Sequence, residues 1–230
     1  MRNASTSRLR MLLVVTMVVV SSLTLASFSF KFFTLEKAAS RIVELENSLI
    51  RIQATLNVDS IRNYKIQKII AVMNRHNQKL SSDLRYNIAS EIYEMSIKYP
   101  NLDIELICAT ITHESAFTWR PSVVSKAGAM GLMQIMPATG EFLAQAEGLP
   151  WTNEKDILFN PIYNIRLGSR YLSTLISMYS LDGGLAAYNG GERKASLWLK
   201  NGRDNSFLWK ETRGYIPAVL KLYEEYKKKS

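Results

Sequence analysis

From residue 81 to the C-terminus, the sequence reads as one helical segment after another. Apolar residues recur at helical spacing, and the segments begin at Ser, Asp or Asn-Pro signals or carry a proline near their start. The expected helices cover residues 81–100, 102–112, 137–148, 160–180, 181–189, 192–200 and 211–229. Neither a β-type alternation nor an internal repeat accompanies this pattern. The sequence therefore predicts a compact, mostly α domain over residues 81–230.

The N-terminal residues 1–33 carry a long run without charge. The run "MLLVVTMVVVSSLTLASFSF" holds twenty residues, follows three arginines and ends before Lys31. About 20 apolar residues can cross a bilayer as one helix, and the preceding arginines place the N-terminus inside. These features predict a cytoplasmic tail and a transmembrane signal-anchor, with the rest of the chain exported. A cleaved signal peptide is the alternative.

Between these two parts, residues 34–80 predict a helical stalk. Its first half has apolar residues spaced alternately by three and four, which is the a/d pattern of a coiled coil. The residues of this seam are Leu35, Ala38, Ile42, Leu45, Leu49, Ile52 and Leu56. Arg41 and Glu46 fall at g and e positions, where they suit an interchain pair. The interpretation is a homo-oligomer formed through residues 34–58, and the alternative is a single helix that packs on its own domain.

Charge is distributed unevenly along the chain. The formal net charge is +9, yet residues 82–230 hold seventeen Lys or Arg and sixteen Asp or Glu. A domain so close to neutral lacks the basic footprint of a nucleic-acid-binding domain, so no nucleic-acid partner is expected. The single cysteine, Cys108, excludes an intramolecular disulfide and reads as a buried thiol.

Glu114 is the first candidate for chemistry. It lies two residues after the segment 102–112, on the continuation of the same helix, and shares a helical face with Ile107, Thr110 and Ile111, so it projects from an apolar stripe. Burial and the negative end of the helix dipole should both raise the pKa of this carboxyl. A carboxylic acid that stays protonated near neutrality can cleave a glycosidic bond by general acid catalysis. A partly exposed glutamate at a helix end, without function, is the alternative.

Further blocks downstream share a recognisable order. "HESAF" is followed by "AGAMGLMQIMPATG", then "NPIYNIRLGSRYL", then "AAYNGG" and "ETRGYI". Together they resemble the catalytic domain of the soluble lytic transglycosylase (Slt-like) family, over about two-thirds of the chain. The resemblance implies a lysozyme-like fold and a peptidoglycan lytic transglycosylase. Such an enzyme cleaves the β-1,4 bond between N-acetylmuramic acid and N-acetylglucosamine without water, leaves a 1,6-anhydro end, and needs no metal or cofactor.

The resemblance also implies roles for individual residues. Glu114 is the single general acid/base, and no second carboxylate is expected across the cleft. The substrate-binding residues that it implies are Ser115, Ser125, Met133, Gln134, Met136, Tyr188, Asn189, Glu211 and Tyr215. The implied partner is the peptidoglycan glycan strand, and the implied location is the bacterial inner membrane with the catalytic domain in the periplasm. Anchored transglycosylases of this kind often open the wall for a larger assembly, which suggests an envelope-spanning partner.

One departure from the family pattern concerns the loop after Glu114. The family reads "ESxFxP", whereas this chain reads "ESAFTWRP", about two residues longer. The enlargement brings in Trp119, which either stacks on glycan or packs under the loop. It also puts the placement of Ser125 in question.

Two other functions fit parts of the same sequence. A hydrolase similar to goose-type lysozyme would use the same fold, and a catalytically silent wall-binding module would use the same surface. A zinc peptidase is excluded, because "HESAF" lacks the second histidine of the H-E-x-x-H motif.

Overall fold

The structure of this chain is a computed structural model that describes residues 2–228. The side chains of residues 2–10, 12, 30, 32, 34, 35, 38 and 39 lie outside this description, and with them Leu35 and Ala38 of the expected heptad seam. The chain divides into two compact units, residues 1–59 and residues 60–230.

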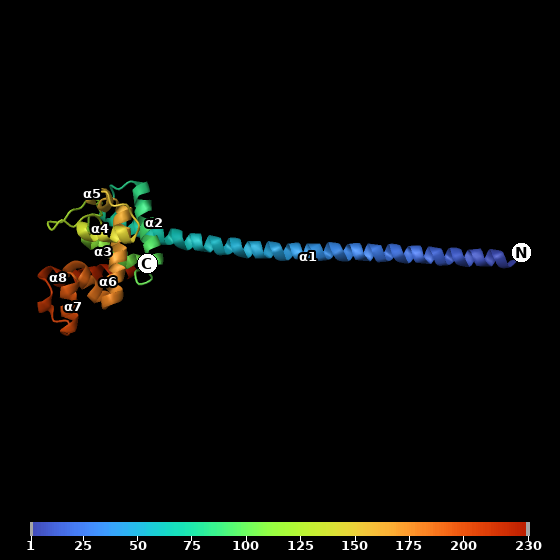
Figure 1. Ribbon diagram of the computed structural model, residues 1–230. Coiled ribbons are helices and arrows are strands. Elements are labelled where there is room, and N and C mark those ends of the chain that lie inside the picture. The colour runs from blue at the N-terminus through green and yellow to red at the C-terminus, as the bar shows by residue number, and fades with distance from the viewer. Residues whose placement is uncertain (1, 229–230) are drawn as a thin grey trace. The chain divides into compact units, whose positions relative to one another are not determined.

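The first unit is a single helix in the described residues. It belongs to α1, Arg2–His76, which continues into the second unit (Figure 1). Five residues of the heptad seam have described side chains, and each is more than half exposed: Ile42, Leu45, Leu49, Ile52 and Leu56. These side chains are therefore largely exposed to solvent within the described part of the chain.

The expectation of a membrane-spanning helix within residues 1–33 is not supported. Among residues 2–228, no helix is long and apolar enough to cross a membrane.

The second unit is a helical domain, as the sequence predicts. Isolated bridges of Met130 with Val124 and with Ile135 are the only β pairings in its described residues. Its helices after α1 are α2 Ser82–Lys98, α3 Ile104–Glu114, α4 Pro137–Ala146, α5 Glu154–Leu158, α6 Pro161–Gly190, α7 Glu192–Lys200 and α8 Lys210–Lys228, with a 3-10 turn η1 at Asn205–Phe207. The sequence patterns predicted all of these except α5 and η1, which are too short to show a helical period.

The helix α6 organises this domain. It contacts α2, α4, α5, α7 and α8, and Figure 1 shows α4 and α5 beside its first half and α7 beside its second half. α6 consists of two helical segments that meet at a kink at Ser180, whose φ of 65° and ψ of 178° are not helical, so the break expected between residues 160–180 and 181–189 is confirmed. Beyond the kink, Gly183 and Gly184 allow close packing, since a Cβ on Gly184 would lie 2.7 Å from the Cα of Ile176.

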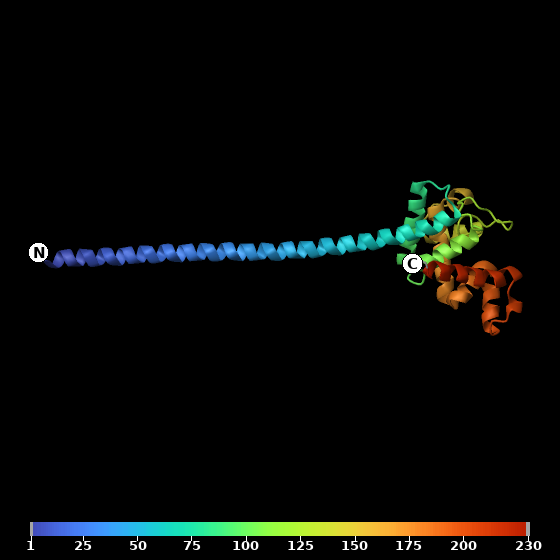
Figure 2. The same ribbon diagram turned by 180° about the vertical axis from the view of Figure 1, so that it is seen from behind.

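The last turns of α1 belong to the core of the second unit. Ile66, Ile69, Val72 and Met73 are buried there, so the apolar face of these turns packs into the domain, although the sequence pattern assigns residues 34–80 to the stalk. Lys68 pairs with Glu105 of α3, and His76 meets Tyr226 of α8. Figure 2 shows these turns entering beside the other helices of the domain.

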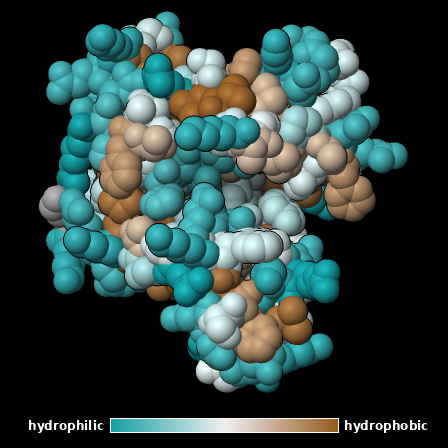
Figure 3. Space-filling model, turned by 90° about the vertical axis from the view of Figure 1, so that its left-hand side faces the viewer, coloured by the Kyte–Doolittle hydropathy of each residue, from teal (hydrophilic) through white to brown (hydrophobic). Residues whose placement is uncertain are grey.

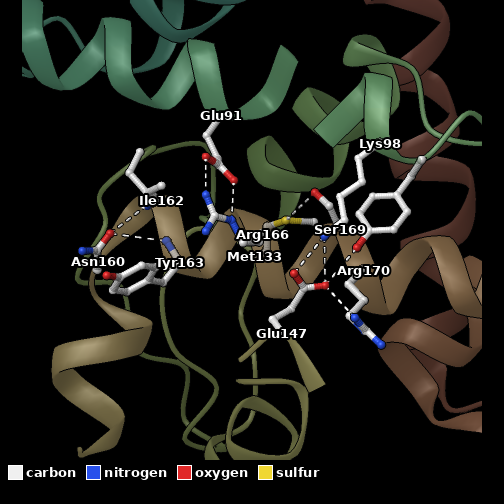
Figure 4. A network of polar contacts seen from close by, with 11 residues as sticks. Glu91, Lys98, Met133, Glu147, Asn160, Ile162, Tyr163, Arg166, Ser169 and Arg170 are labelled. Atoms are coloured by element: carbon white, nitrogen blue, oxygen red, sulfur yellow. Dashed lines mark hydrogen bonds and ion pairs between the residues drawn. The ribbon is translucent and has the colours of Figure 1, made fainter. Parts of the chain in front are cut away.

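Two buried carboxylates fasten α6 to its neighbours (Figure 4). Glu91 of α2 accepts two hydrogen bonds from Arg166, at 2.9 and 3.1 Å. Glu147, just after α4, accepts from Arg170 at 2.6 Å and from Lys98 at 2.8 Å. Burial alone would raise the pKa of Glu147, but the hydrogen bonds from Lys98 and Arg170 outweigh it and lower that pKa.

Candidate active site

Glu114 is the last residue of α3, and the sequence explains why the helix presents it there. Asp103 caps the start of α3 by accepting a hydrogen bond from the Leu106 amide at 2.8 Å. Residues 104–112 are all buried, so the helix crosses the core before it reaches Glu114. The helix then stops, because Ala116 and Phe117 adopt positive φ angles of 50° and 60°. Glu114 is half-buried at the end of this helix.

The electrostatic setting of Glu114 favours its protonated form. Burial raises the pKa of this carboxyl to about 7, the nearby Tyr215 hydroxyl lowers it by less, and the negative charge of Glu211 adds to the rise. No ion pair to Glu114 occurs among the described residues. The sequence prediction of a raised pKa is therefore confirmed, and desolvation is its main cause.

Tyr215 of α8 covers the carboxyl. It is 2% exposed, and its ring stands edge-on against the ring of His113 with centroids 4.8 Å apart. Its hydroxyl is close enough to affect the pKa of Glu114, but no partner lies in good hydrogen-bonding geometry to it within the described chain. The contact with Glu114 is therefore loose, and the hydroxyl remains able to bond a group that enters the site.

A groove of about 320 Å³ opens beside this acid. The residues that line it include Gln134, Met136, Tyr171, Tyr188, Asn189 and Gly191. Glu114 is not among the lining residues, but its charge raises the pKa of Tyr188, after the larger effect of burial, so acid and groove are neighbours. The face drawn in Figure 3 is largely hydrophilic, with hydrophobic residues in separate groups.

The loop of residues 130–136 forms one wall of the groove, and Asn164 holds it in place. The Asn164 side chain is fully buried, donates to the carbonyls of Met130 and Leu158 and accepts from the Met133 amide. Gly131 makes this possible, because its φ is +83° and a Cβ there would lie 2.1 Å from Asn164 Nδ2. The glycine-methionine block is thus a shaped backbone wall and not a flexible segment.

The tyrosine and asparagine of the expected "AYN" block lie at this wall. Tyr188 donates a hydrogen bond to the Met133 carbonyl at 2.7 Å, and Asn189 accepts one from Thr212 at 2.7 Å. Gln134, with a φ of 46°, donates to the carbonyls of Val123 and Gly131. These polar side chains border the groove while their bonds fix its walls.

Other residues named from the sequence lie off the groove surface. Ser115 is fully buried, and its hydroxyl accepts from the Trp119 amide at 3.0 Å, so it supports the loop after Glu114. Ser125 closes a turn with Ala129. Met133 is fully buried, and its side chain would touch a Cβ on Gly168. Glu211 is exposed on α8.

Trp119 resolves the question that the longer loop raises. It is fully buried, and its indole Nε1 donates to Thr112 Oγ1 at 3.0 Å. The loop after Glu114 therefore packs its tryptophan inward, and Trp119 does not offer a stacking surface.

Sequence reasoning did not assign Tyr171, Asn164 or Thr212. Tyr171 lines the groove and stacks at a tilt on Tyr188, with centroids 5.4 Å apart. Asn164, Gly168, Tyr171 and Leu175 share one helical face. The signal that was missed is an asparagine on the apolar face of this helix, because an amide that becomes buried must find hydrogen-bond partners.

Within the described residues, no cluster of three His, Cys, Asp or Glu side chains could hold a metal ion. The chemistry that the site offers through its own residues is proton transfer by one carboxyl beside a polar groove.

Comparisons with known proteins agree with this geometry. The family described as Transglycosylase SLT domain matches residues 91–208. A putative soluble lytic murein transglycosylase from Haemophilus influenzae is 34% identical over 150 residues, which are 61% of this chain and 25% of that protein. Membrane-bound lytic murein transglycosylase C from Shigella sonnei is 36% identical over 111 residues, 44% of this chain and 30% of that protein.

A solved structure is similar in fold. The X-ray structure of an inactive mutant of lytic transglycosylase Slt from Pseudomonas aeruginosa superposes with a TM-score of 0.53 and 30% identity, over 61% of this chain and 24% of that one. The chain thus spans about a quarter of the length of these Slt relatives.

Proposed function

Because this chain belongs to the transglycosylase SLT domain family, we propose that it is a peptidoglycan lytic transglycosylase. It cleaves the β-1,4 bond between N-acetylmuramic acid and N-acetylglucosamine and leaves a 1,6-anhydro muramic acid end. The observation that carries this proposal is the state of Glu114. This half-buried carboxyl lies beside a groove, and burial raises its pKa to about 7.

A single carboxyl can perform both proton transfers of this reaction. Protonated Glu114 gives its proton to the glycosidic oxygen as the bond to C1 breaks. The acetamido group of the N-acetylmuramic acid stabilises the positive charge that develops at C1. Ionised Glu114 then takes the proton of the C6 hydroxyl of this sugar while the hydroxyl oxygen bonds to C1. The acid is thereby regenerated and no water is consumed. An intramolecular nucleophile has a large advantage in effective concentration over water.

The surroundings of Glu114 suit this use of one acid. A carboxyl that must be protonated at the start benefits from desolvation and from the absence of a nearby cation. The Tyr215 hydroxyl has no hydrogen-bond partner among the described residues, so it can donate to a substrate oxygen or to ionised Glu114. Tyr188 and Tyr171 present aromatic and hydroxyl groups to a sugar in the groove.

The test is product analysis after digestion of purified peptidoglycan by the full chain. Mass spectrometry should find muropeptides that end in 1,6-anhydro muramic acid. Glu114→Gln should release them at least about a hundredfold more slowly, whereas Glu147→Gln, which changes a buried carboxyl elsewhere, should release the same products at the wild-type rate. Anhydro products released by Glu114→Gln at the wild-type rate would overturn the assignment.

One observation favours a hydrolase as a second candidate. Glu211 is close enough for its charge to raise the pKa of Glu114, so a second carboxylate is near the site. If Glu211 activated water, the products would carry reducing muramic acid ends, and Glu211→Gln would abolish them. We assign Glu211 an electrostatic role instead, since it is exposed.

We further propose that a second copy of this chain covers the exposed heptad seam. The seam residues Ile42, Leu45, Leu49 and Ile52 are 56% to 59% exposed, and Arg41 and Glu46 are placed to pair across a parallel dimer. The pattern ends at the next d and a positions, which are Asp59 and Asn63, where the second unit begins. The following d residue, Ile66, is buried in the chain's own core.

Sedimentation of the full chain tests this partner. Leu45→Asp with Leu49→Asp should shift the chain to monomer. Val43→Asp with Ile50→Asp is the matched control, because these residues are equally exposed but lie on the b positions of the same helix. A monomeric wild type, or equal effects of both pairs, would contradict a seam-specific dimer.

We place the site of action in the periplasm, on the outer side of the cytoplasmic membrane. The support is chemical: the glycan strands that the groove would bind lie there. One relative is itself named a membrane-bound lytic murein transglycosylase.

A further inference from the structure

The loop after Glu114 is built around internal hydrogen bonds. The Thr118 hydroxyl donates to the Ser115 carbonyl at 2.6 Å, and the Phe117 amide donates to the Thr112 carbonyl at 2.8 Å. Trp119 has a positive φ of 48° and is fully buried. Such a backbone persists only where surrounding contacts fix it, and here the tryptophan side chain supplies them.

A chain of hydrogen bonds runs from this loop through three helices. Trp119 Nε1 donates to Thr112 Oγ1 at 3.0 Å, Thr112 Oγ1 lies 3.0 Å from the Tyr226 hydroxyl, and that hydroxyl lies 3.0 Å from His76 Nε2. The indole can only donate, and a neutral imidazole can accept. If each group donates a hydrogen bond to the next, from Trp119 through Thr112 and Tyr226 to His76, every donor has one acceptor.

The end of α1 also holds the outer side of the loop. The Asn77 side chain donates to the Trp119 carbonyl at 3.5 Å, and the ring of His76 is tilted against Phe117 with centroids 5.9 Å apart. The loop is thus held from inside by Thr112 and from outside by the last turn of α1.

The position of Thr112 links this chain to the chemistry. It lies two residues before Glu114 on α3, while Tyr226 lies on α8, the helix that brings Tyr215 to Glu114. A bond between Thr112 and Tyr226 therefore fixes the end of α3 against the helix that carries the acid's partner.

We propose that Thr112, Trp119 and Tyr226 are positioning residues that hold Glu114 in register with Tyr215. The hydrogen bonds that join these residues to one another and to His76 form a latch, and Trp119 of the loop after Glu114 is its buried end. The proposal rests on the proposed function. It also makes the last turn of α1 part of the catalytic machinery, as the site that anchors the latch.

Loss of these hydrogen bonds should change the pH dependence of the activity. The groups that face Glu114 are Tyr215 and Glu211 of α8, Tyr188 of α6 and the neighbouring His113. If the end of α3 loosens, water reaches the carboxyl and the pKa of Glu114 falls toward its ordinary value. Activity that needs protonated Glu114 is then lost at a lower pH, so the alkaline limb of the profile moves down.

The variants are Thr112→Val and Tyr226→Phe, each of which removes one hydroxyl and keeps the bulk of the side chain. Each should lower kcat about five- to twentyfold, since small misplacements of a catalytic group are costly, and move the alkaline limb to lower pH. KM should stay within about twofold, because the groove residues are unchanged.

The matched control is Thr110→Val. Thr110 is equally buried on the same helix, but its hydroxyl donates to the Leu106 carbonyl within α3. Circular dichroism verifies folding of all variants. If both latch variants behave like Thr110→Val while Glu114→Gln is inactive, the latch is wrong and the function stands. If Glu114→Gln is fully active, the function itself fails.

Discussion

Glu114 and Glu147 are both carboxyls with little access to solvent, but they have opposite surroundings. Glu147 lies between Lys98 and Arg170, and these cations hold its pKa below the ordinary value despite burial (Figure 4). Glu114 has a loosely bonded tyrosine and a second carboxylate as neighbours, and burial raises its pKa to about 7. Burial acts in the same direction on both groups, so the neighbours decide which one keeps its proton.

This difference separates a structural acid from a catalytic one. Glu147 is satisfied in its ionised form and joins the segment after α4 to α2 and α6. Glu114 is not satisfied as an anion, and it borders a groove. Perturbed carboxyls gather at functional sites because chemistry near neutral pH needs them there.

The largest expected effect is on catalysis. Glu114→Gln should lower kcat by about two to four orders of magnitude, since it removes the group that transfers the proton. Glu147→Gln should leave kcat per folded molecule within about twofold, as that carboxyl lies away from the groove lining. Turbidity assays on purified peptidoglycan measure both, and similar losses in the two variants would break the comparison.

In stability, the order of the two variants should be the reverse of their order in loss of kcat. Glu147→Gln removes a carboxylate that accepts hydrogen bonds from Lys98 and Arg170 and leaves both cations without their anionic partner. The free energy of unfolding should therefore fall by about 2 kcal/mol. Glu114→Gln should be neutral or stabilising at pH 7, because it removes a carboxyl that is strained as an anion. Urea unfolding of the two variants provides the values. A loss for Glu114→Gln as large as that for Glu147→Gln would contradict the difference in surroundings.

The two carboxyls should also respond to pH with opposite signs. The folded pKa of Glu114 is raised from 4.5 to about 7, so the folded state holds a proton that the unfolded state releases, and stability falls as pH rises between these values. This effect is at most on the order of 3 kcal/mol. The folded pKa of Glu147 is lowered, so its contribution is present above the unfolded pKa and is lost as pH falls through the folded pKa.

Urea unfolding at several pH values tests these signs. The stability of Glu114→Gln relative to wild type should rise between pH 4.5 and 7. The deficit of Glu147→Gln should shrink as the pH falls below its ordinary pKa. A flat difference for Glu114→Gln would show that this carboxyl titrates normally.

The smallest effect concerns Glu211. Its charge raises the pKa of Glu114, so Glu211→Gln should lower that pKa slightly and move the alkaline limb of activity down by a few tenths of a pH unit, as expected for an exposed charge. Anhydro products should persist. Since screening weakens exposed charges, high salt should produce the same shift in wild type and none in Glu211→Gln.

Local pattern predicted much of the fold and the acid itself. The helical period and caps predicted α2, α3 and α8, and the apolar face of α3 predicted a desolvated Glu114. The break at Ser180, between the helices expected at residues 160–180 and 181–189, was predicted as well. The expected membrane span was not supported.

Long-range packing determined what the sequence left open. Thr112, which accepts the Trp119 indole bond, also contacts Tyr226, 114 residues away in the sequence. Tyr226 in turn contacts His76, 150 residues away. Asn164 reaches back to the loop at Met130 and Met133. Residue spacing cannot reveal such contacts, because they depend on how α6 and α8 pack against α3.

The central claim is that Glu114 keeps its proton near neutral pH. Carbon NMR of the chain labelled at glutamate side-chain carboxyls measures this directly, with the Glu114 signal identified by its absence in Glu114→Gln. The account predicts that this signal titrates with a midpoint near 7. A midpoint near the ordinary value of 4.5 would contradict it.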